Sequence, residues 1–128
     1  MEASALLDAH VQLKRLYTSI NEALDVSRQL AEAVDRDDQV AIQMLVAMRQ
    51  EPVEKMVHAK RTLELQQDAL PEADGARLRA LLKGAAAEDP GEEAFVKQVG
   101  MNDRLLRQLC DLDRVLNKKL TRDKSIYQ

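Results

Sequence analysis

The chain is short of aromatic, cysteine and histidine residues, and each shortage excludes a class of function or structure. Only Tyr17, Phe95 and Tyr127 are aromatic among its 128 residues, so aliphatic side chains must build the core. The stacking platforms of single-strand nucleic-acid binders are missing as well. Cys110 is the only cysteine, which excludes an intrachain disulfide and fits a reducing compartment.

The sequence also lacks the usual marks of a catalytic or metal site. Its two histidines, His10 and His58, belong to no Glu-x-x-His pair of the di-iron bundle type and to no Cys/His cluster with zinc spacing. No glycine-rich loop is present to hold a phosphate. Cys110 has no histidine near it in sequence to activate a nucleophile. We therefore expect no catalytic residue, no metal and no cofactor.

No apolar run approaches the roughly 20 residues of a transmembrane helix, and the chain opens Met1-Glu2-Ala3 without a basic leader. We therefore expect neither membrane insertion nor a signal peptide. The net charge of −3 does not favour nucleic acid. Residues 97–128 carry a net +4, which leaves −7 for the rest of the chain. This uneven distribution of charge has two interpretations: a basic helix that lies on an acidic body, or a charged surface that steers a partner.

What the sequence does contain is helical periodicity. Apolar residues recur at spacings of three, four and seven residues in four segments, at about 3–34, 39–68, 76–83 and 90–122. Asp37 or Asp38 is suited to cap the second segment, and the short break before it predicts an antiparallel hairpin. The fold class is therefore all-α. We predict one domain, residues 1–128, forming an elongated antiparallel helical bundle of three long helices and one short helix.

Pro52 interrupts the second segment. The apolar stripe keeps its phase on both sides of the proline, and residues 49–51 offer no good N-cap. This favours one continuous helix with a kink, and the alternative is a break with Pro52 at the first position of a new helix.

Polar residues within the apolar stripes suggest further roles. Asn102 shares a heptad position with Phe95, Leu109 and Leu116, where a polar side chain fixes register. Arg49 and Lys60 fall near the middle of the second stripe, so either their stems pack while their heads reach water, or they converge in the pocket of a small bundle enzyme. Met44 and Met48 lie off that stripe and could contact either the short helix or a partner.

The pattern as a whole resembles the bacterial flagellar export chaperones of the FlgN type, with the FliT type as a near neighbour. The resemblance covers most of the chain and rests on helix lengths and scattered positions, and Pro52 departs from it because a plain helix former is usual there. The residues that carry it are an acidic turn, a second helix with a Leu, an Arg-Gln pair and an apolar pair, an Asn followed by leucines, and a short basic tail: Val34–Asp38, Leu45, Arg49-Gln50, Pro52-Val53, Asn102, Leu105, Leu106, Leu109 and Ile126-Tyr127.

The resemblance implies a cytoplasmic, non-enzymatic chaperone. Such a protein binds the C-terminal helical segment of a secreted hook-associated or cap protein and delivers it to the export gate. The partner-binding residues predicted on this basis are four leucines of the last long helix: Leu109, Leu112, Leu116 and Leu120. The final turns of that helix are expected to become ordered against the partner. The alternatives are that these leucines form the core or a homodimer seam. Three hypotheses follow: an export chaperone, a homodimeric coiled-coil protein and a small helical-bundle enzyme.

Overall fold

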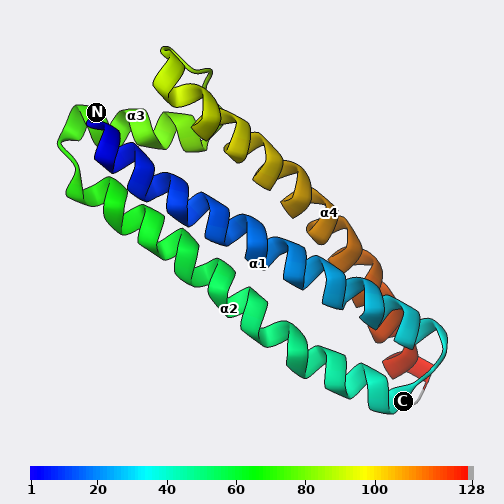
Figure 1. Cartoon of the computed structure of the whole chain (residues 1–128). Helices are drawn as coiled ribbons and strands as arrows, with labels where there is room; N and C mark the ends of the chain where they lie inside the picture. The colour runs from blue at the N-terminus through cyan, green and yellow to red at the C-terminus, as the bar shows by residue number, and fades with distance from the viewer. Residues whose placement is uncertain (127–128) are drawn as a thin grey trace.

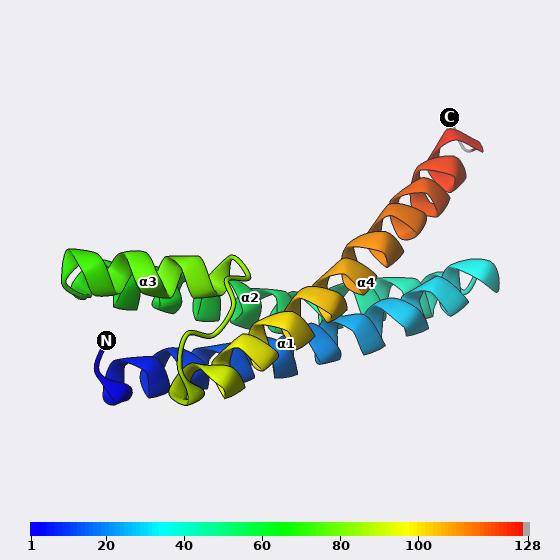
Figure 2. The same ribbon diagram turned by 90° about the horizontal axis from the view of Figure 1, so that it is seen from above.

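The computed structural model describes residues 1–126, with side chains as far as residue 121. These residues form four helices and no strand: α1 (Ala3–Asp35), α2 (Gln39–Ala69), α3 (Glu72–Leu82) and α4 (Pro90–Ile126). The predicted all-α bundle of three long helices and one short helix is confirmed (Figure 1). The central helix α1 packs against α2 on one side and α4 on the other. Figure 2 shows α4 crossing the α1–α2 hairpin obliquely, with α3 over one end of the hairpin.

The hairpin between α1 and α2 is closed by two aspartates. Asp37 has a positive φ of 54°, and the amide of Asp38 reaches back to the carbonyl of Ala33 at 3.0 Å, which ends α1. The Asp38 side chain then accepts a hydrogen bond from the amide of Ala41 at 3.1 Å, which begins α2. The predicted capping role is confirmed for Asp38.

Helix α2 runs without interruption through Pro52, which is buried inside it. The prediction of one continuous helix is confirmed, and the alternative of two helices meeting at residue 52 is wrong. Apolar contacts on both sides of the proline hold the helix together, since Leu45 and Ala59 are both buried. Packing along the whole helix therefore outweighs the local cost of a proline that cannot donate to the carbonyl of Met48.

Replacement of Pro52 by Ala is expected to raise the free energy of unfolding by about 2 kcal/mol. An interior proline costs about 3 kcal/mol relative to Ala, and loss of the buried ring returns roughly 1 kcal/mol. Urea denaturation followed by circular dichroism measures the change. A less stable Ala variant would mean that the proline ring sets a backbone shape that the bundle needs.

Helix α3 begins earlier than the sequence predicted. The sequence predicts a helix over about 76–83, whereas the helix starts at Glu72 directly after Pro71. Gly75 reads as a helix breaker in sequence, but here it allows close approach of two helices. A Cβ atom at Gly75 would lie 2.9 Å from the carbonyl oxygen of Gln67 in α2. The glycine therefore seats α3 against α2 instead of ending a turn.

Gly84 closes α3. Its φ is +103°, its amide bonds to the carbonyl of Leu81 at 3.1 Å, and the amide of Ala85 bonds to the carbonyl of Ala80 at 3.0 Å. These two bonds form a Schellman motif, in which a residue of positive φ satisfies the last carbonyls of a helix.

Helix α4 begins as the sequence predicted and extends further. Asp89 caps it by accepting a hydrogen bond from the amide of Glu92 at 3.1 Å. The helix reaches Ile126, four residues beyond the predicted end at 122. Of the predicted basic tail, Tyr127 lies outside the described residues, and the side chains of residues 122–126 lie outside the described side chains. The expected ordering of this end against a partner therefore stays a prediction.

Every seventh residue of α4 is buried, which fixes how the helix lies on its neighbours. Phe95, Asn102, Leu109 and Leu116 are all at most 6% exposed. The Asn102 side chain donates to the carbonyl of Leu13 at 2.9 Å and accepts from Gln98 at 2.9 Å. Because a slip of α4 along α1 would break these bonds in a buried place, Asn102 fixes the register as predicted.

A network of hydrogen bonds ties α3 to the start of α4. Arg77 donates to Glu92 through Nε at 3.1 Å and Nη2 at 2.6 Å, and Glu92 also accepts from the amide of Glu88 at 2.9 Å. These bonds, that from Arg77 first, lower the pKa of the Glu92 carboxyl below its ordinary value. The bond with Glu92 likewise raises the pKa of the Arg77 guanidinium.

The lowered pKa of Glu92 predicts an acid-sensitive contribution to stability. A carboxyl whose pKa is depressed by folding stabilises the fold above its unfolded pKa of about 4.3, and the contribution is lost as the pH falls through the folded pKa. Glu92→Gln should therefore melt at a lower temperature than the parent chain at pH 7, with the difference shrinking below about pH 4. Thermal melts between pH 7 and pH 3 measure this, and parallel curves over that range would contradict it.

Candidate functional site

The three long helices leave one side of the bundle open. Helix α1 packs against both α2 and α4, but α2 and α4 make few direct contacts with each other. A groove therefore runs between α2 and α4 with α1 as its floor. We call it the α2–α4 groove, and it has a larger and a smaller section.

The larger section has a volume of about 460 Å³. Its floor is formed by three apolar side chains of α1: Leu13, Leu16 and Ile20. The α2 wall contributes Met56, Val57, Lys60, Leu63, Glu64 and Gln67, and the α4 wall contributes Val99, Asn102, Asp103 and Leu106. Val57 is 62% exposed and Leu106 is 39% exposed, so the free chain leaves apolar side chains in water on both walls. An apolar partner surface placed here would bury both side chains.

The smaller section lies further along the same two helices, nearer the α1–α2 turn, as a hollow of about 310 Å³ that shares no lining residue with the larger section. Its lining is Leu30 from α1, Val46, Arg49, Gln50 and Val53 from α2, and Asp113, Leu116, Asn117 and Leu120 from α4. The two sections together extend from Val46 to Gln67 on α2 and from Val99 to Leu120 on α4. At roughly 1.5 Å per residue, each wall is about 32 Å long, the length of a helix of about 20 residues.

The chain itself already fills one end of this groove with a helix. Leu78 and Leu81 of α3 are fully buried against Ala9, Leu63 and Phe95, which belong to α1, α2 and α4. Leu82, the last residue of α3, lines the larger section. Figure 2 shows that α3 covers only one end of the hairpin. The open groove therefore begins where α3 ends, and α3 shows that a helix fits between these walls.

The four leucines predicted to bind a partner have two different environments. Leu109 and Leu116 are 4% and 3% exposed, in core clusters with residues of α1 or of α1 and α2. Leu112 and Leu120 are half-buried and pack against the same clusters. Leu116 and Leu120 also line the smaller section of the groove, whereas Leu109 and Leu112 line neither section. In the free chain Leu109 and Leu116 therefore belong to the core, which the sequence left open as an alternative, whereas Leu112 and Leu120 lie at the edge of the core.

The sequence analysis missed the exposed residues of the groove, above all Val57 and Leu106. The second predicted helix has a broad apolar stripe, and this breadth was the signal in the sequence for the α2 wall. That stripe includes buried Leu45 and Leu63 together with exposed Val46 and Val57. A stripe wider than one neighbouring helix can cover indicates a second contact surface.

Arg49 and Lys60 do not converge. Arg49 lines the smaller section and Lys60 the larger one, so the shared polar pocket that would favour a small enzyme is not formed by these two residues. Arg49 instead bridges the three long helices. Its Nε donates to Ser27 Oγ of α1 at 2.9 Å, and its Nη2 forms a short ion pair with Asp113 of α4.

The histidines and the cysteine are placed apart from one another. His10 of α1 packs edge-on against the ring of Phe95, with ring centroids 5.9 Å apart, and burial followed by the charge of Lys14 lowers its pKa. Cys110 is exposed on α4, and His58 lies on α2. Among the described residues, no group of three or more His, Cys, Asp and Glu side chains is arranged to hold a metal ion.

A further hollow of about 510 Å³ lies between α1 and α2, away from α4. Polar and charged side chains dominate its lining, among them Lys14, Arg15, Lys55, His58 and Glu22. The α2–α4 groove is therefore the better candidate for binding an apolar partner.

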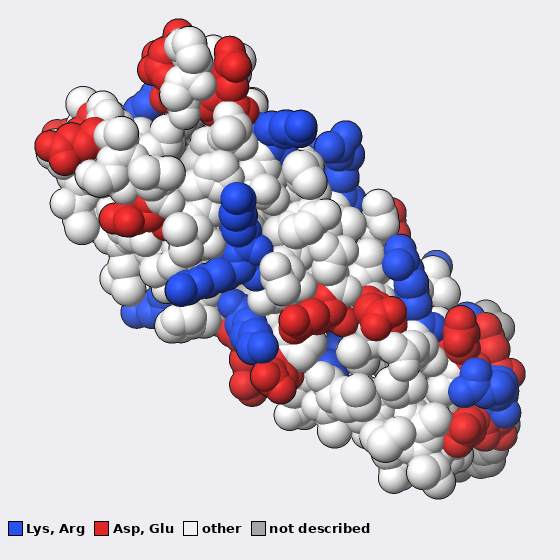
Figure 3. All heavy atoms as spheres, viewed as in Figure 1, with Lys and Arg blue, Asp and Glu red and all other residues white. Residues whose placement is uncertain are grey.

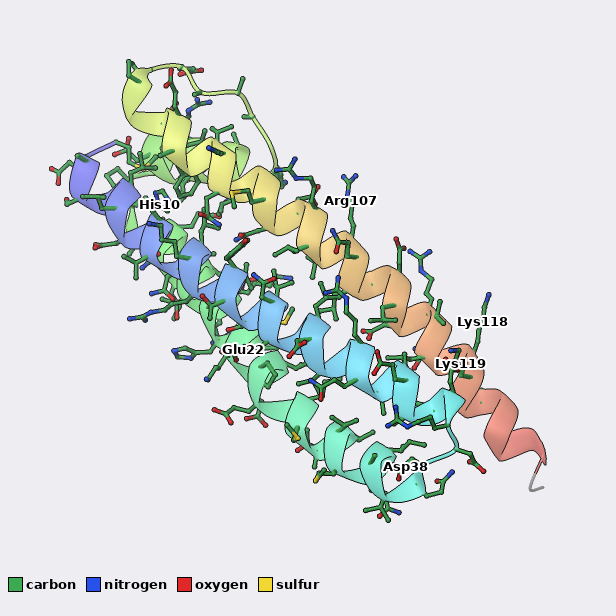
Figure 4. All side chains as sticks on the ribbon, turned by 45° about the vertical axis from the view of Figure 1, so that its right-hand side comes forward. His10, Glu22, Asp38, Arg107, Lys118 and Lys119 are labelled. Atoms are coloured by element: carbon green, nitrogen blue, oxygen red, sulfur yellow. The ribbon has the colours of Figure 1, made fainter. Side chains whose placement is uncertain are left out.

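Charges are interspersed on the face shown in Figure 3, where basic and acidic side chains alternate along the bundle. One basic side chain of α4 contacts α1, because Lys119 forms an ion pair with Asp35 at 2.6 Å. Arg107 and Lys118 point away from α1 into solvent (Figure 4). Both interpretations of the charge asymmetry thus have residues that fit them.

Within the described residues, no helix is both long and apolar enough to cross a membrane. Comparison with models of known families, with curated proteins and with solved structures gives no match to this chain. The fold and the groove therefore carry the functional argument, together with the resemblance noted in the sequence.

Proposed function

We propose that this chain is a cytoplasmic export chaperone of the flagellar type, which holds an amphipathic helix of a secreted protein in the α2–α4 groove. The observation that carries the proposal is the larger section of the groove. Apolar side chains from all four helices line it, and Val57 and Leu106 remain exposed on opposite walls. In this proposal the protein binds and delivers, and catalyses no reaction.

The shape of the groove supports a helical partner. A helix placed in the larger section, which Leu82 of α3 borders, would turn the three long helices into a four-helix bundle locally. The walls accommodate about 20 residues of helix at roughly 1.5 Å per residue. The bound segment must carry an apolar stripe of helical period, because the floor and both walls are mainly apolar.

The identity of the partner comes from the resemblance to flagellar export chaperones. Their secreted partners, hook-associated and cap proteins, are bound through C-terminal helical segments that would otherwise assemble early. A groove that covers the apolar face of such a helix would prevent this assembly until the segment reaches the export gate. Of the four predicted leucines, Leu116 and Leu120 are retained as edge contacts of the smaller section.

Co-purification tests the proposal. The full chain is expressed with the C-terminal segment of each flagellar hook-associated and cap protein in turn, and sedimentation gives the mass of what is recovered. We expect a monomeric free chain and a one-to-one complex with at least one of these segments. A free chain that is already a stable dimer, and that captures none of them, would favour the homodimeric alternative.

A further inference from the structure

Arg49 is a charged residue in the lining of the smaller section of the groove. It lies on α2 within an otherwise mainly apolar stretch, between Val46 and Val53, which line the same section. Its guanidinium reaches over α1 to α4, bound to Ser27 on the way and to Asp113 at the far side. The Arg49 and Asp113 side chains keep 27% and 38% of their surface exposed, so water reaches both in the free chain.

This ion pair has unused hydrogen-bonding capacity. A guanidinium carries more N–H donors than the two bonds to Ser27 and Asp113 use, and a carboxylate accepts several hydrogen bonds. No other hydrogen bond from either side chain to a described residue accompanies these two. In the free chain, water satisfies the remaining donors and acceptors. A helix that covers the smaller section removes this water, and an apolar side chain over the pair would leave them unsatisfied.

The charge of the pair decides which side chain can replace the water. Arg49 and Asp113 together are neutral, so an added carboxylate or ammonium group would bring an uncompensated charge into a covered site. A carboxamide fits both partners, because its oxygen accepts from Arg49 while its NH₂ group donates to Asp113.

We infer that Arg49 and Asp113 together select a partner helix whose apolar stripe is interrupted by one Asn or Gln. This inference rests on the proposed function, since it concerns what the α2–α4 groove accepts. Arg49 lies three residues from Val46, at the end of the α2 wall remote from α3. The carboxamide should therefore lie about one helical turn from the corresponding end of the bound helix, at roughly 3.6 residues per turn.

Host peptides provide the test. A 24-residue helical peptide with Leu at its apolar positions and Glu and Lys elsewhere is labelled and titrated with the full chain, and binding is followed by fluorescence anisotropy. Each apolar position is then changed to Asn in turn. At the position that faces Arg49, we expect Asn or Gln to bind about tenfold more tightly than Leu, Asp or Lys, whereas Asn at every other apolar position weakens binding.

Two variants of the chain link this preference to the ion pair. Arg49→Met combined with Asp113→Leu replaces the pair by apolar groups and should reverse the preference to Leu. Asp113→Asn leaves Arg49 in place with a net positive charge and should shift the preference from Asn to Asp, which gives a second test if the double variant folds poorly. Circular dichroism verifies the fold of each variant.

The outcomes separate the inference from the proposal on which it rests. If the peptides bind in the groove but Leu is preferred throughout, or if the preference for Asn is unchanged in both variants, the inference is wrong and the groove function stands. If no peptide of the series binds, helix binding by the groove is itself contradicted, and the inference falls with it.

Discussion

Leu116→Asp is expected to lower the free energy of unfolding by at least about 4 kcal/mol, because it places a carboxylate in the core. Leu116 is 3% exposed and packs against Leu30, Val34 and Leu45, which belong to α1 and α2. Removing a buried leucine side chain alone costs about 2–5 kcal/mol, and burial of a charge without a partner adds to it. Domains of this size have a total stability of about 5–15 kcal/mol. A loss of this size should therefore leave a large fraction of the molecules unfolded.

Val115→Asp is the matched control, since it introduces the same side chain one residue away on the same helix. Val115 is 45% exposed and lines neither section of the groove, so its replacement should change stability by only about 0.5 kcal/mol. Urea denaturation of both variants, followed by circular dichroism, makes the comparison. Equal stability of the two would mean that Leu116 is a surface contact, as the sequence first suggested, and that the packing of α4 is different.

Val57→Asp combined with Leu106→Asp is expected to weaken capture of a partner helix by about a hundredfold or more while the fold is retained. The two side chains face the larger section from opposite walls. Losing the burial of both on binding costs about 3 kcal/mol, before the cost of desolvating two carboxylates is added, and about 1.4 kcal/mol corresponds to a factor of ten. Because Val57 is 62% exposed and Leu106 is 39% exposed in the free chain, the loss of stability should be much smaller than that caused by Leu116→Asp.

The control for this pair is Val40→Asp with Val115→Asp, which makes the same chemical change on α2 and α4 away from the groove. It should bind as the parent chain does. If both double variants weakened binding equally, the effect would come from added negative charge and not from the groove. If the groove variant bound normally, the recognition surface would lie elsewhere on the chain.

Most of the helices could be predicted from the sequence because local rules set their ends. Asp38 and Asp89 act as N-caps, and Gly84 ends α3, as their residue types indicate. The start of α3 was missed because Gly75 has two opposite uses. In sequence it signals a turn, whereas in the structure its lack of a Cβ lets α3 lie close to the Gln67 carbonyl. Only the position of α2 in space distinguishes these uses.

The partner-binding residues predicted on α4 remain a prediction, and the groove proposed here differs from them for a related reason. The wide apolar face of α4 suggested an uncovered surface near its end, yet Leu109 and Leu116 are buried by the other helices of the same chain. Periodicity shows which face of a helix is apolar but not which neighbour covers it. The open side of the bundle depends on α4 packing mainly on α1, an arrangement that involves contacts distant in sequence. Asn102 is a residue whose position in the sequence did indicate a contact between distant segments, and its side chain donates to the carbonyl of Leu13.

The methionines allow the central claim to be measured directly. Met56 lines the larger section of the groove, whereas Met44 and Met48 are 58% and 50% exposed on the same helix and line neither section. With the methionine methyl groups labelled with carbon-13, a helical partner segment or host peptide is titrated into the full chain and NMR spectra are recorded. Binding in the α2–α4 groove predicts that the Met56 signal shifts while those of Met44 and Met48 stay in place. Shifts at Met44 and Met48 with an unchanged Met56 signal would contradict the groove and place the partner on the outer face of α2.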